Sequence, residues 1–258
     1  MILYGILGDP VSHSHSPMIH NAWIKKYKIN AHYQYIPVKK GECLREILSL
    51  LPLIGYAGIN VTVPYKEDVF AILPAMQKDT EIRAINTIKW IGDKCYGYNT
   101  DVYGFRTSVE NHFGKSVFNG KKVLVLGAGG ASLAVLHALK DMSVDETFIY
   151  NRTFENAKKL EGKFNITALQ NLHYANIAHF DVIINATTVG LSGELYPIDY
   201  NQITSDQIII DLIYNPDKTK FLLECEKRGA KIMNGYGMLI EQARKSFEIW
   251  TDILPQNT

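Results

Sequence analysis

The feature that most constrains the fold of this chain is the alternation of short apolar runs with longer segments of helical spacing. This alternation is typical of βαβ units, in which helices connect mostly parallel strands. The predicted strands are residues 2–8, 33–38, 58–63, 85–90, 95–98, 123–126, 147–150, 182–185 and 208–212, and the predicted helices are residues 16–26, 42–51, 101–113, 130–140 and 238–250. The sequence therefore predicts an α/β fold.

Composition excludes several classes of protein. Hydrophobic residues make up 47% of the 258 residues, enough for a buried core in one large domain or two moderate ones. The net charge of +1 gives no field that attracts nucleic acid or an anionic membrane. No window approaches the roughly 18–20 apolar residues of a membrane span, and no signal peptide is predicted. Cys43, Cys95 and Cys225 are widely spaced, which predicts reduced thiols in a cytoplasmic protein.

A glycine-rich turn follows one predicted strand and opens a helix. The strand 123–126 is followed by Gly127, Ala128, Gly129, Gly130 and Ala131. Glycines permit a tight turn and a close approach of the backbone, and the helix N-terminus offers free N–H groups, so the segment suits a dinucleotide pyrophosphate. Ser132 stands where a third glycine is expected. Because such turns also join strands to helices for structural reasons, the triplet alone leaves both interpretations open.

The end of the next strand indicates which dinucleotide is bound. An NAD site usually has Asp or Glu about 20 residues after the glycines. Asn151, Arg152 and Thr153 occupy that place here. A guanidinium binds a 2′-phosphate that a carboxylate would repel, so the sequence predicts NADP. The alternative is that Arg152 is an ordinary surface arginine.

Polar side chains gather in the loops and strand ends of the first hundred residues. They are Ser14, Ser16, Asn60, Thr62, Lys66, Asn86, Thr87, Asn99, Thr100 and Asp101. Individually they allow simpler interpretations: Ser14, Ser16 or Asp101 as helix caps, Asn60 as a turn residue and Lys66 as a solvated lysine. Together they converge at the carboxyl ends of strands, where open α/β sheets bind ligands. Hydroxyls, amides, an ammonium and a carboxylate suit a polyhydroxylated carboxylic acid.

An ordered set of motifs resembles the shikimate dehydrogenase family. The matching stretches are 14–17 (SHSP), 60–67 (NVTVPYKE), 84–87 (AINT), 97–101 (GYNTD), 127–131 (GAGGA), 151–153 (NRT), 185–187 (NAT), 211–216 (DLIYNP) and 235–242 (GYGMLIEQ). They occur in family order over nearly the whole chain, which makes the resemblance specific.

The resemblance implies two α/β domains. Residues 1–102 would form the substrate-binding catalytic domain, with 236–258 packing back on it, and 103–235 would form a Rossmann-like NADP-binding domain. Lys66 and Asp101 would be the catalytic pair. Substrate would be held by Ser14, Ser16, Asn60, Thr62, Asn86, Tyr214 and Gln242. The cofactor (NADPH) would be bound by the glycine turn 127–131, by Asn151, Arg152 and Thr153, and near the nicotinamide by Thr187, Leu212 and Gly235.

The family reaction implied is the reversible NADPH-dependent reduction of 3-dehydroshikimate to shikimate. Alternatives are a quinate/shikimate dehydrogenase that uses NAD, a non-catalytic ligand sensor and a folate-type methylene dehydrogenase. Ser16 favours shikimate, Lys66 and Asp101 argue against a sensor, and Asn156, where the family often has a second basic residue, weakens the preference for NADP. His13, His15 and His20 lack a carboxylate or cysteine partner, so no metal is expected. The expected partners are small molecules, without nucleic acid or membrane, for a monomer or homodimer.

Overall fold

The chain folds into two compact units. The computed structural model describes residues 1–73, 82–172 and 176–256. The first unit combines residues 1–104 with 240–258, and the second contains residues 105–239. Within the described residues, no helix has the length and apolar character that crossing a membrane requires.

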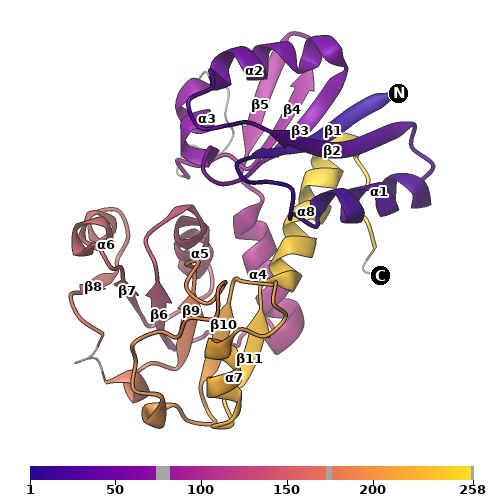
Figure 1. Cartoon of the computed structure of the whole chain (residues 1–258). Helices are drawn as coiled ribbons and strands as arrows, with labels where there is room; N and C mark the ends of the chain where they lie inside the picture. The colour runs from indigo at the N-terminus through magenta and orange to yellow at the C-terminus, as the bar shows by residue number, and fades with distance from the viewer. Residues whose placement is uncertain (74–81, 173–175, 257–258) are drawn as a thin grey trace. The chain divides into compact units, whose positions relative to one another are not determined.

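A five-stranded mixed sheet forms the first unit (Figure 1). Its strand order is β2-β1-β3-β4-β5, in which β2, β1 and β3 are parallel and β4 and β5 are antiparallel to their neighbours. The elements are β1 (Ile2–Gly8), α1 (Ser16–Lys26), β2 (Ala31–Pro37), α2 (Leu44–Leu50), the 3₁₀ turn η1 (Pro52–Ile54), β3 (Tyr56–Val61), α3 (Lys66–Ile72), β4 (Thr87–Ile91), β5 (Lys94–Tyr98) and most of the last helix α8 (Tyr236–Thr251).

Side chains alternate between the two faces along each strand, so apolar side chains lie on both faces of this sheet. Helices cover both faces (Figure 1). Leu7 and Ile59 belong to the core under α2, together with Leu48. On the opposite face, the ring of Tyr4 stacks on Trp250 of α8 with 4.9 Å between centroids. The last helix of the chain is therefore part of the core of the first unit.

Aromatic rings join α1, β2 and α8. The imidazole of His20 stacks on the ring of Tyr33 at 4.3 Å and packs against Trp23 and Phe247. His20 is completely buried, and this burial lowers its pKa to about 3. The imidazole is therefore neutral at physiological pH, and it packs as one of the rings of this aromatic core.

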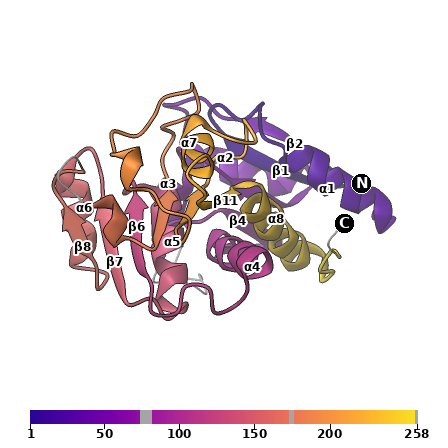
Figure 2. The ribbon, with the colours of Figure 1, turned by 90° about the horizontal axis from the view of Figure 1, so that it is seen from below.

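A six-stranded parallel sheet forms the second unit, with strand order β11-β10-β9-β6-β7-β8. Figure 2 shows β6, β7 and β8 side by side, with α6 next to the edge strand β8. The elements are α4 (Asp101–Phe113, which begins in the first unit), β6 (Lys122–Leu126), α5 (Gly130–Lys140), β7 (Glu146–Tyr150), α6 (Phe154–Glu161), β8 (Thr167–Leu169), η2 (Ile177–His179), β9 (Val182–Asn185), η3 (Tyr200–Gln202), β10 (Ile208–Asp211), α7 (Lys220–Glu226) and β11 (Lys231–Asn234).

The predicted α/β fold is confirmed, with differences at some element ends. The helix predicted for 42–51 is the shorter α2, since Pro52 and the left-handed Gly55 (φ 101°) turn the chain toward β3. The strand predicted for 58–63 ends at Val61, so Thr62 lies just after it. Among the described residues, five α-helices and strands were not predicted, namely α3, α6, β8, α7 and β11, and neither were the three short 3₁₀ turns.

Candidate active site

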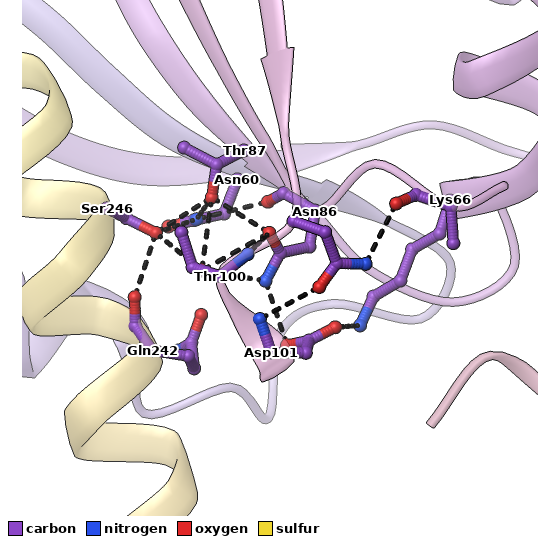
Figure 3. A network of polar contacts seen from close by, with 10 residues as sticks. Asn60, Lys66, Asn86, Thr87, Thr100, Asp101, Gln242 and Ser246 are labelled. Atoms are coloured by element: carbon purple, nitrogen blue, oxygen red, sulfur yellow. Dashed lines mark hydrogen bonds and ion pairs between the residues drawn. The ribbon is translucent and has the colours of Figure 1, made fainter. Parts of the chain in front are cut away.

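Lys66 and Asp101 form an ion pair at the starts of two helices (Figure 3). Lys66 begins α3 and Asp101 begins α4, and Lys66 Nζ lies 2.6 Å from Asp101 Oδ2. The side chains are 19% and 8% exposed, so solvent screens the pair less than it would at the surface. Lys66 stands at the start of a helix, but it is ion-paired and mostly buried, so it is not a solvated lysine. The structure thus brings together the two residues predicted as a pair.

The side-chain amide of Asn86 holds Asp101 from the other side. Asn86 Nδ2 donates to Asp101 Oδ1 at 2.8 Å and to Thr100 Oγ1 at 2.9 Å. Asn86 Oδ1 accepts from the Thr100 backbone N–H at 2.8 Å. Both donors of the amide are therefore used within the protein. A substrate hydroxyl at Asn86 would compete with Asp101 for one of them, and substrate binding by Asn86 stays a prediction.

Asn60 lies inside β3, not in a turn, so the turn interpretation is wrong. Its Oδ1 accepts from the Tyr33 hydroxyl at 2.8 Å, and its Nδ2 donates to the Asn86 backbone carbonyl at 3.1 Å. Asn60 is 4% exposed. Thr62 is half-buried two residues further along, where its backbone N–H bonds to Leu7 of β1. Asn60 thus forms hydrogen bonds that connect neighbouring strands at the end of the sheet where these polar residues lie.

Ser14 and Ser16 lie together between β1 and α1. Ser14 Oγ donates to Ser16 Oγ at 3.1 Å and accepts from the Ser16 backbone N–H at 3.2 Å. Ser16 is buried, and its side chain interacts with the Tyr33 hydroxyl, where it opposes the rise of the Tyr33 pKa that burial causes. The residue that caps α1 is His15, without a side-chain cap, so the cap interpretation of both serines is wrong. Through Tyr33 the serine pair is linked to Asn60.

Gln242 and Tyr214 lie in different units. Gln242 is in α8, is 9% exposed, and lies beside Ser246 and the polar network around Asp101 (Figure 3). Tyr214 is half-buried in the second unit, in the segment after β10. The structure places Gln242 with the other candidate substrate residues, whereas a role for Tyr214 in the same site stays a prediction.

The glycine turn of the second unit joins β6 to α5, as predicted. Gly127 has φ 108°, and a Cβ there would lie 2.6 Å from Thr187 Cγ2, so a side chain at this position would be strained. Gly129 caps α5, which begins at Gly130. The Ser132 hydroxyl is buried and has no hydrogen-bond partner among the described residues. Free N–H groups at the helix start and an unpaired hydroxyl beside it fit the phosphates of a dinucleotide.

Asn151, Arg152 and Thr153 connect β7 to α6. Asn151 Nδ2 donates to the Thr153 carbonyl at 2.8 Å, which closes the turn, and Thr153 is the N-cap residue of α6. Arg152 is exposed and forms no ion pair with any residue that the structure describes. Its guanidinium is therefore available to an anionic group.

Thr187, Leu212 and Gly235 follow β9, β10 and β11, three adjacent parallel strands. Thr187 Oγ1 donates to Asn185 Oδ1 at 2.8 Å. The backbone N–H of Gly235 donates to Ile213 at 3.1 Å, and a Cβ on Gly235 would clash with the Leu212 carbonyl. Gly235 is thus required by a close approach of two backbone segments at this end of the sheet.

A buried carboxyl group orders the loops next to these residues. Asp211 accepts hydrogen bonds from Thr219 Oγ1 (2.6 Å), Asn185 Nδ2 (2.9 Å) and the Ile213 backbone N–H (3.1 Å). Burial raises the pKa of Asp211 to about 6 despite these donors. Asp211 thus ties the ends of β9 and β10 to the segment before α7.

The raised pKa of Asp211 predicts a pH-dependent stability. Because the folded state binds the proton more tightly than the unfolded state, the contribution of Asp211 is complete below about pH 4 and lost as pH rises through 6. The loss amounts to on the order of 3 kcal/mol. We expect the free energy of unfolding of the wild-type protein, measured in urea relative to Asp211→Asn, to fall between pH 4 and pH 7. A difference that stays constant with pH would contradict the assignment.

Several residues of the two networks were not assigned an individual role from the sequence. Tyr33, Thr87, Thr100 and Ser246 belong to the network around Asn60 and Asn86, and Asn185, Tyr196, Asp211 and Thr219 to the one around Thr187. Tyr33, Ser246, Tyr196 and Thr219 stand outside the resemblance motifs, and no local spacing near them indicates chemistry. Thr87, Thr100, Asn185 and Asp211 stand inside those motifs.

Three family models match consecutive parts of the chain. The shikimate dehydrogenase substrate binding domain matches residues 6–88, the shikimate / quinate 5-dehydrogenase model residues 108–193, and the shikimate 5′-dehydrogenase C-terminal domain residues 235–256. Together they cover most of both units.

Individual relatives agree with the family models along the full length. The shikimate dehydrogenase (NADP(+)) of Methanococcus maripaludis is 40% identical over 98% of this chain and 93% of its own. The crystal structure of shikimate dehydrogenase from Aquifex aeolicus is 38% identical, with a TM-score of 0.91 over 99% of this chain and 94% of the other. The shikimate 5-dehydrogenase from Thermus thermophilus, in complex with NADP(H) and shikimate, is 32% identical, with a TM-score of 0.88 over 99% and 95%.

Proposed function

Since this chain belongs to the shikimate dehydrogenase family, we propose that it catalyses the reversible NADPH-dependent reduction of 3-dehydroshikimate to shikimate, a step of aromatic amino-acid (chorismate) biosynthesis. The observation that carries this proposal is the buried Lys66–Asp101 pair, which is held from behind by Asn86. An ammonium held in this way can both donate a proton and stabilise negative charge.

The reaction needs a proton on the carbonyl oxygen as hydride reaches the carbonyl carbon. Bound NADPH supplies the hydride. The Lys66 ammonium donates a proton to the developing alkoxide and stabilises its charge until the proton moves. Asp101 keeps the Lys66 Nζ in place through one oxygen, while Asn86 fixes the other oxygen. In the oxidative direction the same groups take the proton from shikimate.

The substrate's carboxylate and hydroxyls need polar partners. The paired hydroxyls of Ser14 and Ser16 suit the carboxylate, because two adjacent donors match its two oxygens. Thr62, Asn86 and Gln242, with Asn60 behind them, suit the ring hydroxyls. Tyr214 is proposed as a further substrate contact.

The cofactor would be held by the second unit. The turn at Gly127–Ala131 would bind the pyrophosphate at the start of α5, and the turn Asn151–Thr153 the adenosine 2′-phosphate. Thr187, Leu212 and Gly235 would lie near the nicotinamide. The free thiols of Cys43, Cys95 and Cys225 favour a reducing compartment, and we propose that the protein works in the cytoplasm.

The proposed function is tested by absorbance at the nicotinamide band. Purified protein is mixed with shikimate or quinate and with NADP or NAD, in four parallel reactions. Fast reduction of NADP with shikimate alone is the expected result. Comparable rates with quinate or NAD would identify a dual quinate/shikimate dehydrogenase, which is the second candidate because the matched central family model is described as shikimate / quinate 5-dehydrogenase and so covers both substrates. Absence of reduction in all four reactions would contradict the proposal.

Arg152→Ala is expected to weaken NADPH binding without affecting NADH. A charge-assisted hydrogen bond contributes about 1.5–3 kcal/mol, so the KM for NADPH should rise roughly ten- to a hundredfold. The KM values for NADH and shikimate should change little, since neither ligand carries the 2′-phosphate. Steady-state kinetics with both cofactors measures this. An equal rise for NADPH and NADH would show that Arg152 does not recognise the phosphate.

A further inference from the structure

The Ser246 hydroxyl of α8 is the point at which the last helix meets the candidate catalytic site (Figure 3). Ser246 Oγ lies 3.0 Å from Asn60 Nδ2, 2.8 Å from Thr87 Oγ1 and 3.1 Å from Thr100 Oγ1. Ser246 and Thr87 are fully buried and Thr100 is 1% exposed. One side chain of α8 thus contacts the ends of β3 and β4 and the residue that precedes α4.

The direction of the hydrogen bonds follows from the number of protons. Ser246 has one proton, which it donates to the Gln242 carbonyl one turn earlier in α8, at 3.0 Å. The Ser246 oxygen is then an acceptor for the N–H of Asn60 and for a threonine hydroxyl of the sheet. The helix therefore provides an acceptor inside the sheet's polar network, among side chains that are buried from solvent.

The network continues from Ser246 to the ion pair. Thr100 Oγ1 accepts from Asn86 Nδ2 at 2.9 Å, and the second N–H of Asn86 donates to Asp101 Oδ1 at 2.8 Å. Asp101 Oδ2 in turn accepts from Lys66 Nζ. Every step is a hydrogen bond between buried or mostly buried groups, so a change at one end alters the orientation of the others.

We propose that Ser246 is a positioning residue for the reaction, one that acts on Asp101 and Lys66 through Thr100 and Asn86. This inference rests on the proposed function. Without the Ser246 oxygen, the N–H of Asn60 and the threonine hydroxyls lose a buried acceptor and must pair anew. The Thr100 side chain can then rotate, and the hydrogen bond that Asn86 donates to Asp101 changes with it. Ser246 itself need not touch substrate or cofactor.

Ser246→Ala is the first test. Small misplacements of a catalytic group lower turnover roughly ten- to a hundredfold, and we expect a fall in kcat of that order. The KM for NADPH should stay unchanged, since the cofactor residues belong to the other unit. Ser108→Ala is the matched control, because it also removes a buried helical hydroxyl, one that donates to the Phe105 carbonyl of its own helix at 2.8 Å. It should retain the wild-type kcat.

Two further variants separate positioning from a general effect on folding. Ser246→Cys keeps a weak acceptor and should have a kcat between those of the wild type and Ser246→Ala. Thr100→Val interrupts the same path, so the double variant Ser246→Ala/Thr100→Val should lose little more than the more impaired single variant. Losses that multiply, or a Cys variant no better than Ala, would overturn the proposal. If Ser246→Ala proves poorly folded, Ser246→Cys and Thr100→Val decide the matter, because each should then have a kcat below that of the wild type, and wild-type values in both would overturn the proposal.

The wild-type assay distinguishes this inference from the proposed function. If the wild-type protein does not reduce NADP with shikimate, the proposed function fails and the inference fails with it. If the wild-type protein is active and Ser246→Ala keeps its kcat, the inference alone is overturned.

Discussion

Turnover falls by roughly 10²- to 10⁴-fold in Lys66→Ala, while shikimate still binds. The variant removes both the proton donor and the positive charge beside the developing alkoxide, whereas the groups proposed to hold the carboxylate and hydroxyls remain. Steady-state kinetics gives the change in kcat, and isothermal titration calorimetry gives the affinity for shikimate. A variant with wild-type turnover would remove Lys66 from the mechanism.

Two further lysine variants sharpen the result. Lys66→Arg retains a positive charge but does not release a proton at neutral pH, so it separates charge stabilisation from proton transfer. If it recovers part of the lost turnover, charge stabilisation accounts for that part. Lys245→Ala is the control, since Lys245 lies in the same unit and its salt bridge with Glu248 is at the surface. Surface pairs contribute little, and the variant should keep wild-type kinetics.

Trp250→Ala is expected to destabilise the protein by about 3–5 kcal/mol, the range for deletion of a large buried ring. The ring stacks on Tyr4, its Nε1 donates to the Ile88 carbonyl at 2.8 Å, and it fills the space that a Cβ on Gly58 would occupy. Removal therefore leaves a cavity and takes a hydrogen-bond donor from a buried carbonyl. Urea unfolding followed by far-UV circular dichroism measures the loss of unfolding free energy.

Trp250→Phe separates the two contributions of Trp250. Phenylalanine retains most of the stacking on Tyr4 but cannot donate to Ile88, so a loss of about 1–3 kcal/mol is expected. A Trp250→Ala variant with nearly wild-type stability would mean that α8 does not depend on this ring for its attachment to the sheet.

Strong local patterns made much of the fold predictable. β1, α1 and α5 have the predicted bounds because an apolar run or an apolar helical face is closed by clear signals, such as the glycines before α5 and Ser16-Pro17 at the start of α1. The unpredicted elements lack such patterns. In α6 only Ala157 and Leu160 are buried, and β8 has three residues, too few to show a period.

The candidate site was predictable where its residues lie in motifs, and not where the fold alone brings them together. Lys66 and Asp101 stand in short stretches that resemble a known family, and they meet in the structure. Ser246 and Asn60 are 186 residues apart, and nothing near Ser246 in the sequence marks it. Tyr33 likewise looks like an ordinary strand tyrosine in the sequence, yet its hydroxyl donates to Asn60. Contacts of this kind depend on tertiary packing, which local spacing does not encode.

The division of the first unit between residues 1–104 and 240–258 has a consequence for synthesis on the ribosome. The second unit is one uninterrupted stretch and can fold as soon as it has emerged, whereas the first must wait until residues 240–258 have been made. Until then the sheet face around Tyr4 lacks the Trp250 ring, and Asn60 lacks its Ser246 acceptor. A premature stop codon shortly before Ser246 would thus leave the second unit complete and yet disable a site whose Lys66 and Asp101 are encoded far upstream of the stop.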